Sequence, residues 1–330
     1  MKKRIFSGIR ATGRLHIGNY LGAVKGMLSL QDDPKHEMFF AVVDIHAMTT
    51  PYDEKTLVND TREVVLDYLA AGMDPEKSSI LVQSKVADLH AELMFYFSTV
   101  VSVARMRHLP TFKDKVKQHP KNVTMALLNY PILMAADILM YKSELVPVGD
   151  DQLPHLEVAR EIARKMNQKY GCDFPQPQQF RTEGFYVPSL LGKGKMSKSV
   201  EGSYINLADD LNTIKSKLAS APTDSGKGKK VPTQGGVANL LTLVELFQGK
   251  NKKNEYEKAY TSDGIYYKDL KKNLAQAIYK KLKPIQEKRK ELESKPDYVD
   301  KIIEDGAKKA RKIAQETIKK VKGKMGLIKR

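Results

Sequence analysis

Short apolar runs alternate with stretches of helical spacing along the first two hundred residues. The runs that predict strands lie at 3–7, 38–43, 79–82 and 145–148, and the second is apolar at every position, as in a strand covered on both faces. The stretches that predict helices lie at 17–31, 54–71, 87–106, 122–141 and 152–168. This alternation predicts an α/β fold, in which a Rossmann-like parallel sheet carries helices on both faces.

From about residue 200 the pattern changes to helices alone. Residues 220–236 are rich in Gly, Pro, Ser, Thr and Lys and predict a loop. Helical spacing then returns at 237–249, 254–260, 265–294 and 297–323. We therefore predict a Rossmann-like domain over 1–200 and an all-helical domain over 201–330, with the boundary at 185–205. The last helix can pack back on the first domain.

The composition excludes several classes of protein. No apolar run reaches the roughly 18 residues of a membrane span, and no apolar segment follows the basic start, so we expect a cytoplasmic protein without a signal peptide. Cys172 is the only cysteine, which excludes disulfides and cysteine-based metal sites and suits a small apolar filler. The seven histidines show no His-Glu-x-x-His spacing, so we expect no protein-ligated metal.

The chain carries a formal net charge of +17. Residues 281–330 hold 17 Lys and Arg against 8 Asp and Glu, so +9 of that charge lies in the last fifty residues. A field of this kind attracts polyanions such as RNA, but a solvated, lysine-rich helical surface has the same composition. The charge alone leaves both interpretations open.

The first candidate site is a turn between the first strand and the first helix, from Ser7 to Tyr20. Gly18 allows a base or ribose to approach the backbone closely, and the helix start offers free N–H groups to phosphate. His16 and Asn19 can donate to a phosphate oxygen that gains charge in a transition state. The alternative is a capped helix start with an incidental histidine.

The second candidate site is the segment Gly192–Ser199, at the predicted domain boundary. Its glycines suit a mobile loop, and its lysines, Lys195 and Lys198, suit a departing polyphosphate. An exposed basic loop is the alternative reading. The pattern of a P-loop, G-x-x-x-x-G-K-[ST], is absent.

The third candidate is Asp137, an acidic residue inside the otherwise apolar stretch Asn129–Tyr141. A buried carboxylate requires donors, and an indole N–H is a donor only. Tyr130, Met134 and Phe6 would supply flat or adaptable walls for a large ring. Pairing with an internal Arg or with backbone N–H groups would explain the residue equally well.

Taken together, the His16–Tyr20 turn and the Lys195–Ser199 loop resemble the paired signatures of class I aminoacyl-tRNA synthetases. Three further segments resemble the tryptophanyl-tRNA synthetase family within that class: Phe6–Ile9, Tyr130–Tyr141 and Val146–Gln152. The similarity covers nearly the whole chain and is weakest after residue 200.

This resemblance implies a tryptophan–tRNA ligase that works as a homodimer, with tRNA(Trp) bound by the helical domain. Tryptophan would be activated with ATP, accompanied by Mg²⁺, to tryptophanyl-adenylate and pyrophosphate, and then transferred to the 3′ end of tRNA. His16, Asn19, Lys195 and Lys198 would stabilise the reacting charge.

The resemblance also implies two sets of binding residues. The ATP site would comprise Arg10, Ala11, Thr12, Gly18, Asn19, Gly149, Asp150, Asp151 and Val187, with Lys195, Met196, Ser197, Lys198 and Ser199 along the triphosphate. In the tryptophan pocket Asp137 would accept the indole N–H, and the pocket would be shaped or bordered by Phe6, His46, Tyr130, Met134, Val146, Val148 and Gln152.

Some features depart from the family or fit other functions. Arg10-Ala11-Thr12 stands where many members have Gln-Pro-Ser, and Arg10 adds a charge near the substrates. A tyrosyl-tRNA synthetase shares the fold but would be expected to use a Tyr and Asp pair around a phenol. A non-catalytic RNA-binding paralogue would not need His16, Lys195 and Lys198, and a small-molecule adenylating enzyme would lack the basic helical domain.

Overall fold

A parallel five-stranded sheet forms the centre of the molecule. The computed structural model describes residues 2–181, 186–198 and 200–328. The strands lie in the order β3-β2-β1-β4-β5, and every pairing is parallel, so the predicted Rossmann-like α/β class is confirmed. Their bounds are β1 (Lys3–Arg10), β2 (His36–Val43), β3 (Ser78–Val82), β4 (Leu145–Pro147) and β5 (Gln178–Phe180).

Helices cover both faces of the sheet because alternate strand residues point to opposite sides. Phe40 and Val42 belong to one apolar core, whereas Phe39 and Ala41 belong to the other. The helices and helical turns that follow the strands are α1 (Ile17–Asn19), η1 (Tyr20–Val24), α2 (Lys25–Gln31), α3 (Asp44–Ala47), α4 (Leu57–Ala70), η2 (Gln83–Val86), α5 (Ala87–Ser98), α6 (Val103–Arg107), α7 (Pro110–Gln118), α8 (Met125–Met140), η3 (Asp150–Gln152) and α9 (Leu153–Tyr170).

The order of the strands reverses beside β1. From β1 the chain proceeds outward to β2 and β3 and later continues on the other side with β4 and β5. Ligands of open α/β sheets bind at such a switch point, outside the carboxyl ends of the strands. The segments that follow β1, β2, β3 and β4 therefore meet at one edge of the sheet.

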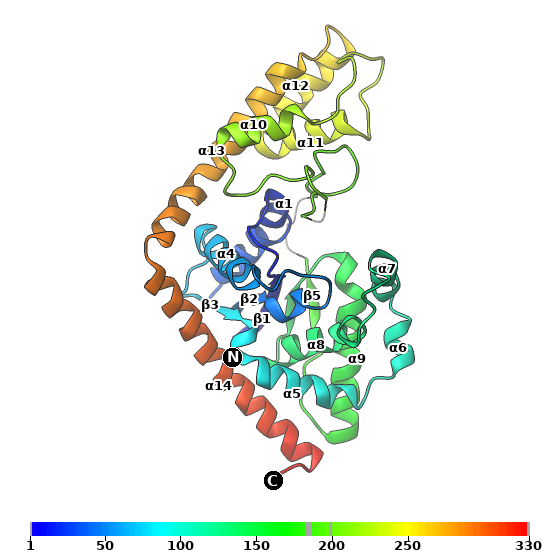
Figure 1. Cartoon of the computed structure of the whole chain (residues 1–330), viewed down its shortest axis with the longest axis vertical. Helices are drawn as coiled ribbons and strands as arrows, with labels where there is room; N and C mark the ends of the chain where they lie inside the picture. The colour runs from blue at the N-terminus through cyan, green and yellow to red at the C-terminus, as the bar shows by residue number, and fades with distance from the viewer. Residues whose placement is uncertain (1, 182–185, 199, 329–330) are drawn as a thin grey trace.

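The remaining helices extend away from the sheet and then return to it (Figure 1). A bundle of α10 (Leu211–Ala219), α11 (Gly236–Gln248) and α12 (Lys250–Thr261) lies beyond the sheet. The long helix α13 (Tyr267–Glu293) runs from this bundle to the sheet, and α14 (Pro296–Met325) continues along it. In the described part of the chain, no helix is long and apolar enough to cross a membrane.

Helix α14 packs against β3 at very short range. A Cβ on Gly306 would lie 1.8 Å from the carbonyl oxygen of Ile80, so only glycine fits at this crossing. Further along α14, Ala310 and Ala314 are fully buried in the second core. Small residues along one face therefore allow the last helix to approach the sheet closely.

The hydrophobic pattern did not predict several elements, among them strand β5 and helices α10 and α7. Strand β5 has only three residues, which are too few to show a period of two. Helix α10 follows Asp210, whose side chain caps the helix by accepting from the N–H of Thr213 (2.7 Å). Helix α7 has no fully buried residue, and its Phe112 packs only partly buried against the second core, so its apolar face is short.

Candidate active site

The turn after β1 presents His16 at the start of a helix. His16 is the N-cap of α1: its Nδ1 accepts from the N–H of Asn19, and its own N–H donates to Asn19 Oδ1, both at 3.2 Å. Two residues predicted to act together are thus brought together, as a reciprocal cap. The cap fixes the imidazole ring at the carboxyl end of the central strand.

His16 is a neutral hydrogen-bond donor at physiological pH. Burial, followed by the nearby charges of Lys198 and Lys195, lowers the pKa of His16 to about 4. Since Nδ1 accepts a hydrogen bond, the single proton of the neutral ring resides on Nε2. The Nε2–H of the ring can therefore donate to an anion without first being charged.

The second signature loop lies directly on the first turn. The Nζ atom of Lys198 donates to the carbonyl oxygens of Thr12 (2.9 Å) and Gly13 (2.6 Å). A Cβ on Gly18 would lie 2.8 Å from the His16 ring and 3.2 Å from Met196 Cβ, so glycine is needed for this contact. Two motifs about 180 residues apart in the sequence thus form one site.

The pKa of Lys198 is shifted from its ordinary value. Burial lowers its pKa to about 8, although Asp67, Asp60 and Glu63 oppose the shift. Beside it, Met196 donates its N–H to the carbonyl oxygen of Val187 (3.1 Å), and Lys195 forms a β-bridge with Pro188. Val187 itself is buried, so its backbone braces the loop.

Asp137, on α8, is the most buried acidic group of the candidate pocket, with 1% of the residue exposed. Its Oδ1 accepts from Gln83 Nε2 (2.7 Å) and His90 Nδ1 (2.6 Å), and its Oδ2 accepts from His46 Nε2 (2.8 Å). Burial disfavours the charge, but the hydrogen bonds from His46 and His90 outweigh it and hold the pKa of Asp137 well below its ordinary value.

These contacts leave part of the carboxylate open. An ionised carboxylate has about four acceptor positions, and the described residues supply donors to three of them. The fourth position belongs to Oδ2, beside His46. Among the described residues, Asp137 is therefore an anchored acceptor whose Oδ2 can accept one further N–H.

A second chain of hydrogen bonds borders this pocket. The ring of Tyr130 packs edge-on against His46, with centroids 6.4 Å apart, and its hydroxyl contacts His155 Nε2 (2.7 Å). His155 Nδ1 contacts Gln152 Oε1 (3.0 Å), which joins the segment after β4 to α8. Hydrogen bonds and ring contacts thus connect four of the predicted pocket residues: His46, Tyr130, Asp137 and Gln152.

Arg10 reaches the same region from the end of β1. Its Nη2 donates to Thr50 Oγ1 (2.7 Å), and burial lowers its pKa while the neighbouring Tyr130 raises it. Burial, followed by the charge of Arg10, lowers the pKa of Lys115 on α7. Arg10, which departs from the family pattern, therefore borders both the predicted ATP site and the predicted tryptophan pocket.

The other predicted residues occupy varied positions. A pocket of about 270 Å³ joins Val148, Gly149 and Asp150 to Gly22 and Ala23, which follow the first signature. Phe6 is buried and stacks on Tyr141, with centroids 5.7 Å apart. Ala11 and Val146 are buried, Met134 and Ser197 are half-buried, and Ser199 and the side chain of Asp151 lie outside what the structure describes.

Sequence reasoning missed two of the three donors that hold Asp137, since only His46 was predicted for the pocket. Nothing in the pattern singled out Gln83, in the turn after β3, or separated His90, near the start of α5, from other helical residues. His155, inside α9, was missed for the same reason. Buried histidines become visible as a group only once the helices are packed.

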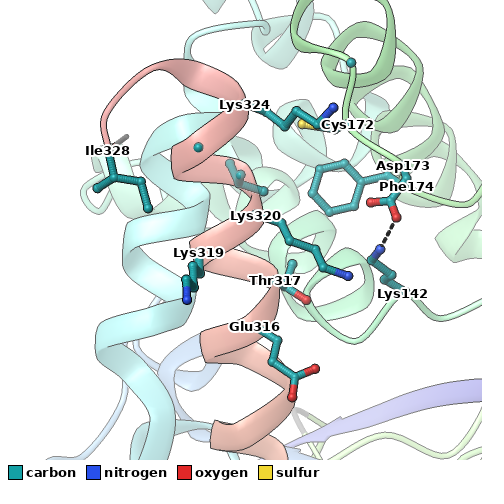
Figure 2. A pocket seen from close by; sticks show the side chains of 13 residues that line it. Lys142, Cys172, Asp173, Phe174, Glu316, Thr317, Lys319, Lys320, Lys324 and Ile328 are labelled. Carbon is teal, nitrogen blue, oxygen red and sulfur yellow. Dashed lines mark hydrogen bonds and ion pairs between the residues drawn. The ribbon is translucent and has the colours of Figure 1, made fainter. Parts of the chain in front are cut away.

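A separate pocket lies between the end of α14 and residues 171–174 (Figure 2). Its volume is about 710 Å³, and Lys319, Lys320 and Lys324 border it together with Lys142, which pairs with Asp173. It contains none of the predicted site residues. Among the described residues, no group of three His, Cys, Asp or Glu side chains could hold a metal ion.

Comparison with known proteins agrees with this geometry. The family model of class I tRNA synthetases (W and Y) matches residues 1–283. Tryptophan–tRNA ligases of Helicobacter pylori and Porphyromonas gingivalis are 43% and 38% identical to the chain, with 99% and 98% of each pair of chains covered. The structure of tryptophanyl-tRNA synthetase from Campylobacter jejuni, complexed with ADP and tryptophan, is 34% identical with a TM-score of 0.86, covering 98% of this chain and 99% of that one. The chain therefore belongs to the class I tRNA synthetase family of the tryptophan and tyrosine enzymes.

Proposed function

We infer that the chain is a tryptophan–tRNA ligase. In the first step a carboxylate oxygen of tryptophan attacks the α-phosphorus of ATP, the bond to the bridging oxygen breaks, and pyrophosphate leaves. In the second step a ribose hydroxyl of the terminal adenosine of tRNA(Trp) attacks the carbonyl carbon of the adenylate, and AMP leaves. The observation that carries this inference is the anchored carboxylate of Asp137, within a site that unites both class I signatures.

We propose that His16 stabilises charge on the phosphates during the first step. Its Nε2–H is uncharged before the reaction, so it gains most when a phosphate oxygen becomes more negative. Asn19 keeps the ring in place through the reciprocal cap and has its amide N–H groups left for phosphate. This role requires no proton transfer.

Lys198 and Lys195 are proposed to neutralise the departing pyrophosphate. Lys198 now donates to two neutral carbonyl oxygens, and a phosphate oxygen is a stronger acceptor for an ammonium group. ATP would therefore draw Lys198 away from Thr12 and Gly13. The other proposed ATP contacts are Arg10, Ala11, Thr12, Gly18, Gly149, Asp150, Asp151, Val187, Met196, Ser197 and Ser199.

We propose that tryptophan places its indole N–H at the open position of Asp137 Oδ2. His46 and Tyr130 then face the ring, and Gln152 is linked to Tyr130 through His155. Phe6, Met134, Val146 and Val148 complete the proposed pocket. A phenylalanine ring would leave the carboxylate without its fourth donor, which is costly in a buried site.

The remaining parts of the proposal concern partners. ATP enters as its Mg²⁺ complex, in which the ion neutralises phosphate charge. We propose residues 1–200 as the catalytic domain and 201–330 as the tRNA-binding domain of a cytoplasmic homodimer. Lys309 and Arg311 form ion pairs with Glu37 and Asp88, so the exposed lysines around them are the better candidates for contact with RNA phosphate.

The overall reaction can be tested by charging. The chain is incubated with labelled tryptophan, ATP and Mg²⁺, together with either a tRNA(Trp) or a tRNA(Tyr) transcript. We expect label on tRNA(Trp) alone. Formation of AMP and pyrophosphate without transfer to either tRNA would instead point to an enzyme that adenylates a small molecule.

A further inference from the structure

Both backbone groups of Leu15, the residue before His16, are held by other elements. Its N–H donates to Asp67 Oδ2, on α4, at 2.5 Å. Its carbonyl oxygen accepts from the N–H of Leu207 at 2.9 Å. The position of the His16 ring therefore depends on two supports that lie outside the turn.

The first support leads to helix α13. Asp67 is completely buried, and its other oxygen forms an ion pair with Arg289, of which only 4% is exposed. Arg289 also donates to Glu63 Oε2 at 2.7 Å. Burial opposes the charge of Arg289, but Asp67 and Glu63 raise its pKa above the ordinary value. A buried carboxylate of this kind keeps its place only while its partner does.

The second support leads to the same face of the same helix. Gln286 lies three residues before Arg289, and its Nε2 donates to the carbonyl oxygens of Leu207 (2.8 Å) and Asp209 (2.9 Å). The segment it holds also forms a β-bridge between Asn206 and His16. One turn of α13 thus reaches Leu15 by two routes, each through a single residue.

We propose that Arg289 and Gln286 are positioning residues for the adenylation step. Through Asp67 and Leu207 they fix the backbone of Leu15 and, with it, the place of His16 Nε2 against the phosphates of ATP. The other end of α13 joins the α10–α12 bundle (Figure 1), so this link also connects that bundle to the ATP site. The inference rests on the proposed function, since it assumes that ATP reacts beside His16.

The test uses two mild substitutions, Gln286→Ala and Arg289→Lys, in the full-length chain. Tryptophan-dependent exchange of pyrophosphate into ATP gives kcat/KM for ATP, and we expect it to fall roughly 10- to 100-fold, because a small misplacement of a catalytic group has that effect. Tryptophan binding should stay unchanged. It can be followed by the fluorescence anisotropy of the ligand itself, since the chain contains no Trp.

Two matched control variants separate positioning from general damage. Gln276→Ala makes the same change on the same helix, at an exposed position. Arg62→Lys weakens another ion pair of α4 with the last helices, between Arg62 and Asp300, that does not lead to Leu15. Both controls should keep wild-type kcat/KM for ATP. Controls that lose as much activity as the test variants would overturn the proposal.

A double-mutant comparison with His16→Ala gives the sharpest readout. If Gln286 and Arg289 act through His16, their substitutions should cost at most about twofold more once His16 is absent. Full additivity, or equal loss of tryptophan binding and ATP use, would contradict positioning. Absence of exchange in the wild-type chain would instead contradict the proposed function, so the two failures are distinguishable.

Discussion

Replacing Asp137 with Asn tests the tryptophan pocket at its centre. The two side chains have nearly the same shape, so the change alters hydrogen bonding and charge and leaves the packing intact. Oδ1 accepts from both Gln83 and His90, so the amide oxygen of Asn should take that side. The amide nitrogen then faces His46 and the open position, where a donor would meet the indole N–H.

The size of the effect follows from two losses. A hydrogen bond to a charged acceptor contributes about 1.5–3 kcal/mol, and a buried donor left without an acceptor costs about 1–3 kcal/mol. Together they amount to about 2.5–6 kcal/mol, or roughly a 10²- to 10⁴-fold decrease in kcat/KM for tryptophan. KM for ATP should stay within about twofold of the wild-type value, because Asp137 is not among the proposed contacts of the phosphates.

The assay is pyrophosphate exchange with tryptophan and with an analogue in which sulfur replaces the indole N–H. Wild type should discriminate against the analogue, whereas Asp137→Asn should use both compounds about equally badly. Asp173→Asn, which breaks the exposed pair with Lys142, serves as the matched control. Thermal melting of each variant separates pocket effects from unfolding. The reasoning is refuted if Asp137→Asn keeps near-wild-type kcat/KM for tryptophan.

Three further predictions concern charge and packing. Lys198, with a pKa of about 8, loses its charge as the pH rises, so a pH profile should show kcat/KM for ATP falling roughly tenfold between pH 7 and pH 9. In Lys198→Arg, whose guanidinium stays charged, the decrease should begin at a higher pH. The pKa of His16 is about 4 in the folded chain and about 6.5 when unfolded, so the unfolded chain binds more protons between these values; urea unfolding should show wild type losing about 2 kcal/mol more than His16→Gln between pH 7 and pH 4.5. Gly306→Ala forces a Cβ onto the carbonyl oxygen of Ile80 and should destabilise the fold by about 1–3 kcal/mol. Gly323→Ala, where the new Cβ would have nothing within 4 Å, should stabilise the fold by up to about 1 kcal/mol. Equal melting temperatures of the two variants would contradict the close packing of α14.

The fold class was accessible from the sequence because the strongest elements are periodic and long enough to recognise. Residues 38–43 are apolar at every position, and they form the buried part of β2. Strand β5 could not be found in this way, since its neighbours rather than its three residues define it. The sequence also gave no reason to expect Gly306 at a helix–strand crossing, because that requirement depends on the packing of α14.

The candidate site was accessible only in part. His16 and Lys198 occur in motifs, so both were predicted, and the structure joins them through Thr12 and Gly13. Asp137 was singled out because a charge inside an apolar helix needs partners, and the partners considered were a ligand's indole N–H or, as the alternative, an internal Arg or backbone groups. Its partners within the chain are His46, His90 and Gln83, which come from three other elements. Pairings of this kind depend on tertiary packing and leave no local pattern.

The basic residues near the end of the chain show the same limit. Arg289 contributes to the +9 charge of the last fifty residues, which predicted either contact with RNA or a solvated surface. It is instead buried against Asp67 and Glu63. The net charge of a segment does not show which of its cations are exposed and which are paired. The exposed cations could be separated from the paired ones only in the structure.

The central claim is that this site activates tryptophan. The most direct measurement is exchange of labelled pyrophosphate into ATP, with each of the twenty amino acids in turn and no tRNA. The account predicts exchange with tryptophan alone, since only an indole supplies an N–H at the open position of Asp137. Exchange with tyrosine, or none with any amino acid even after tRNA is added, would contradict it.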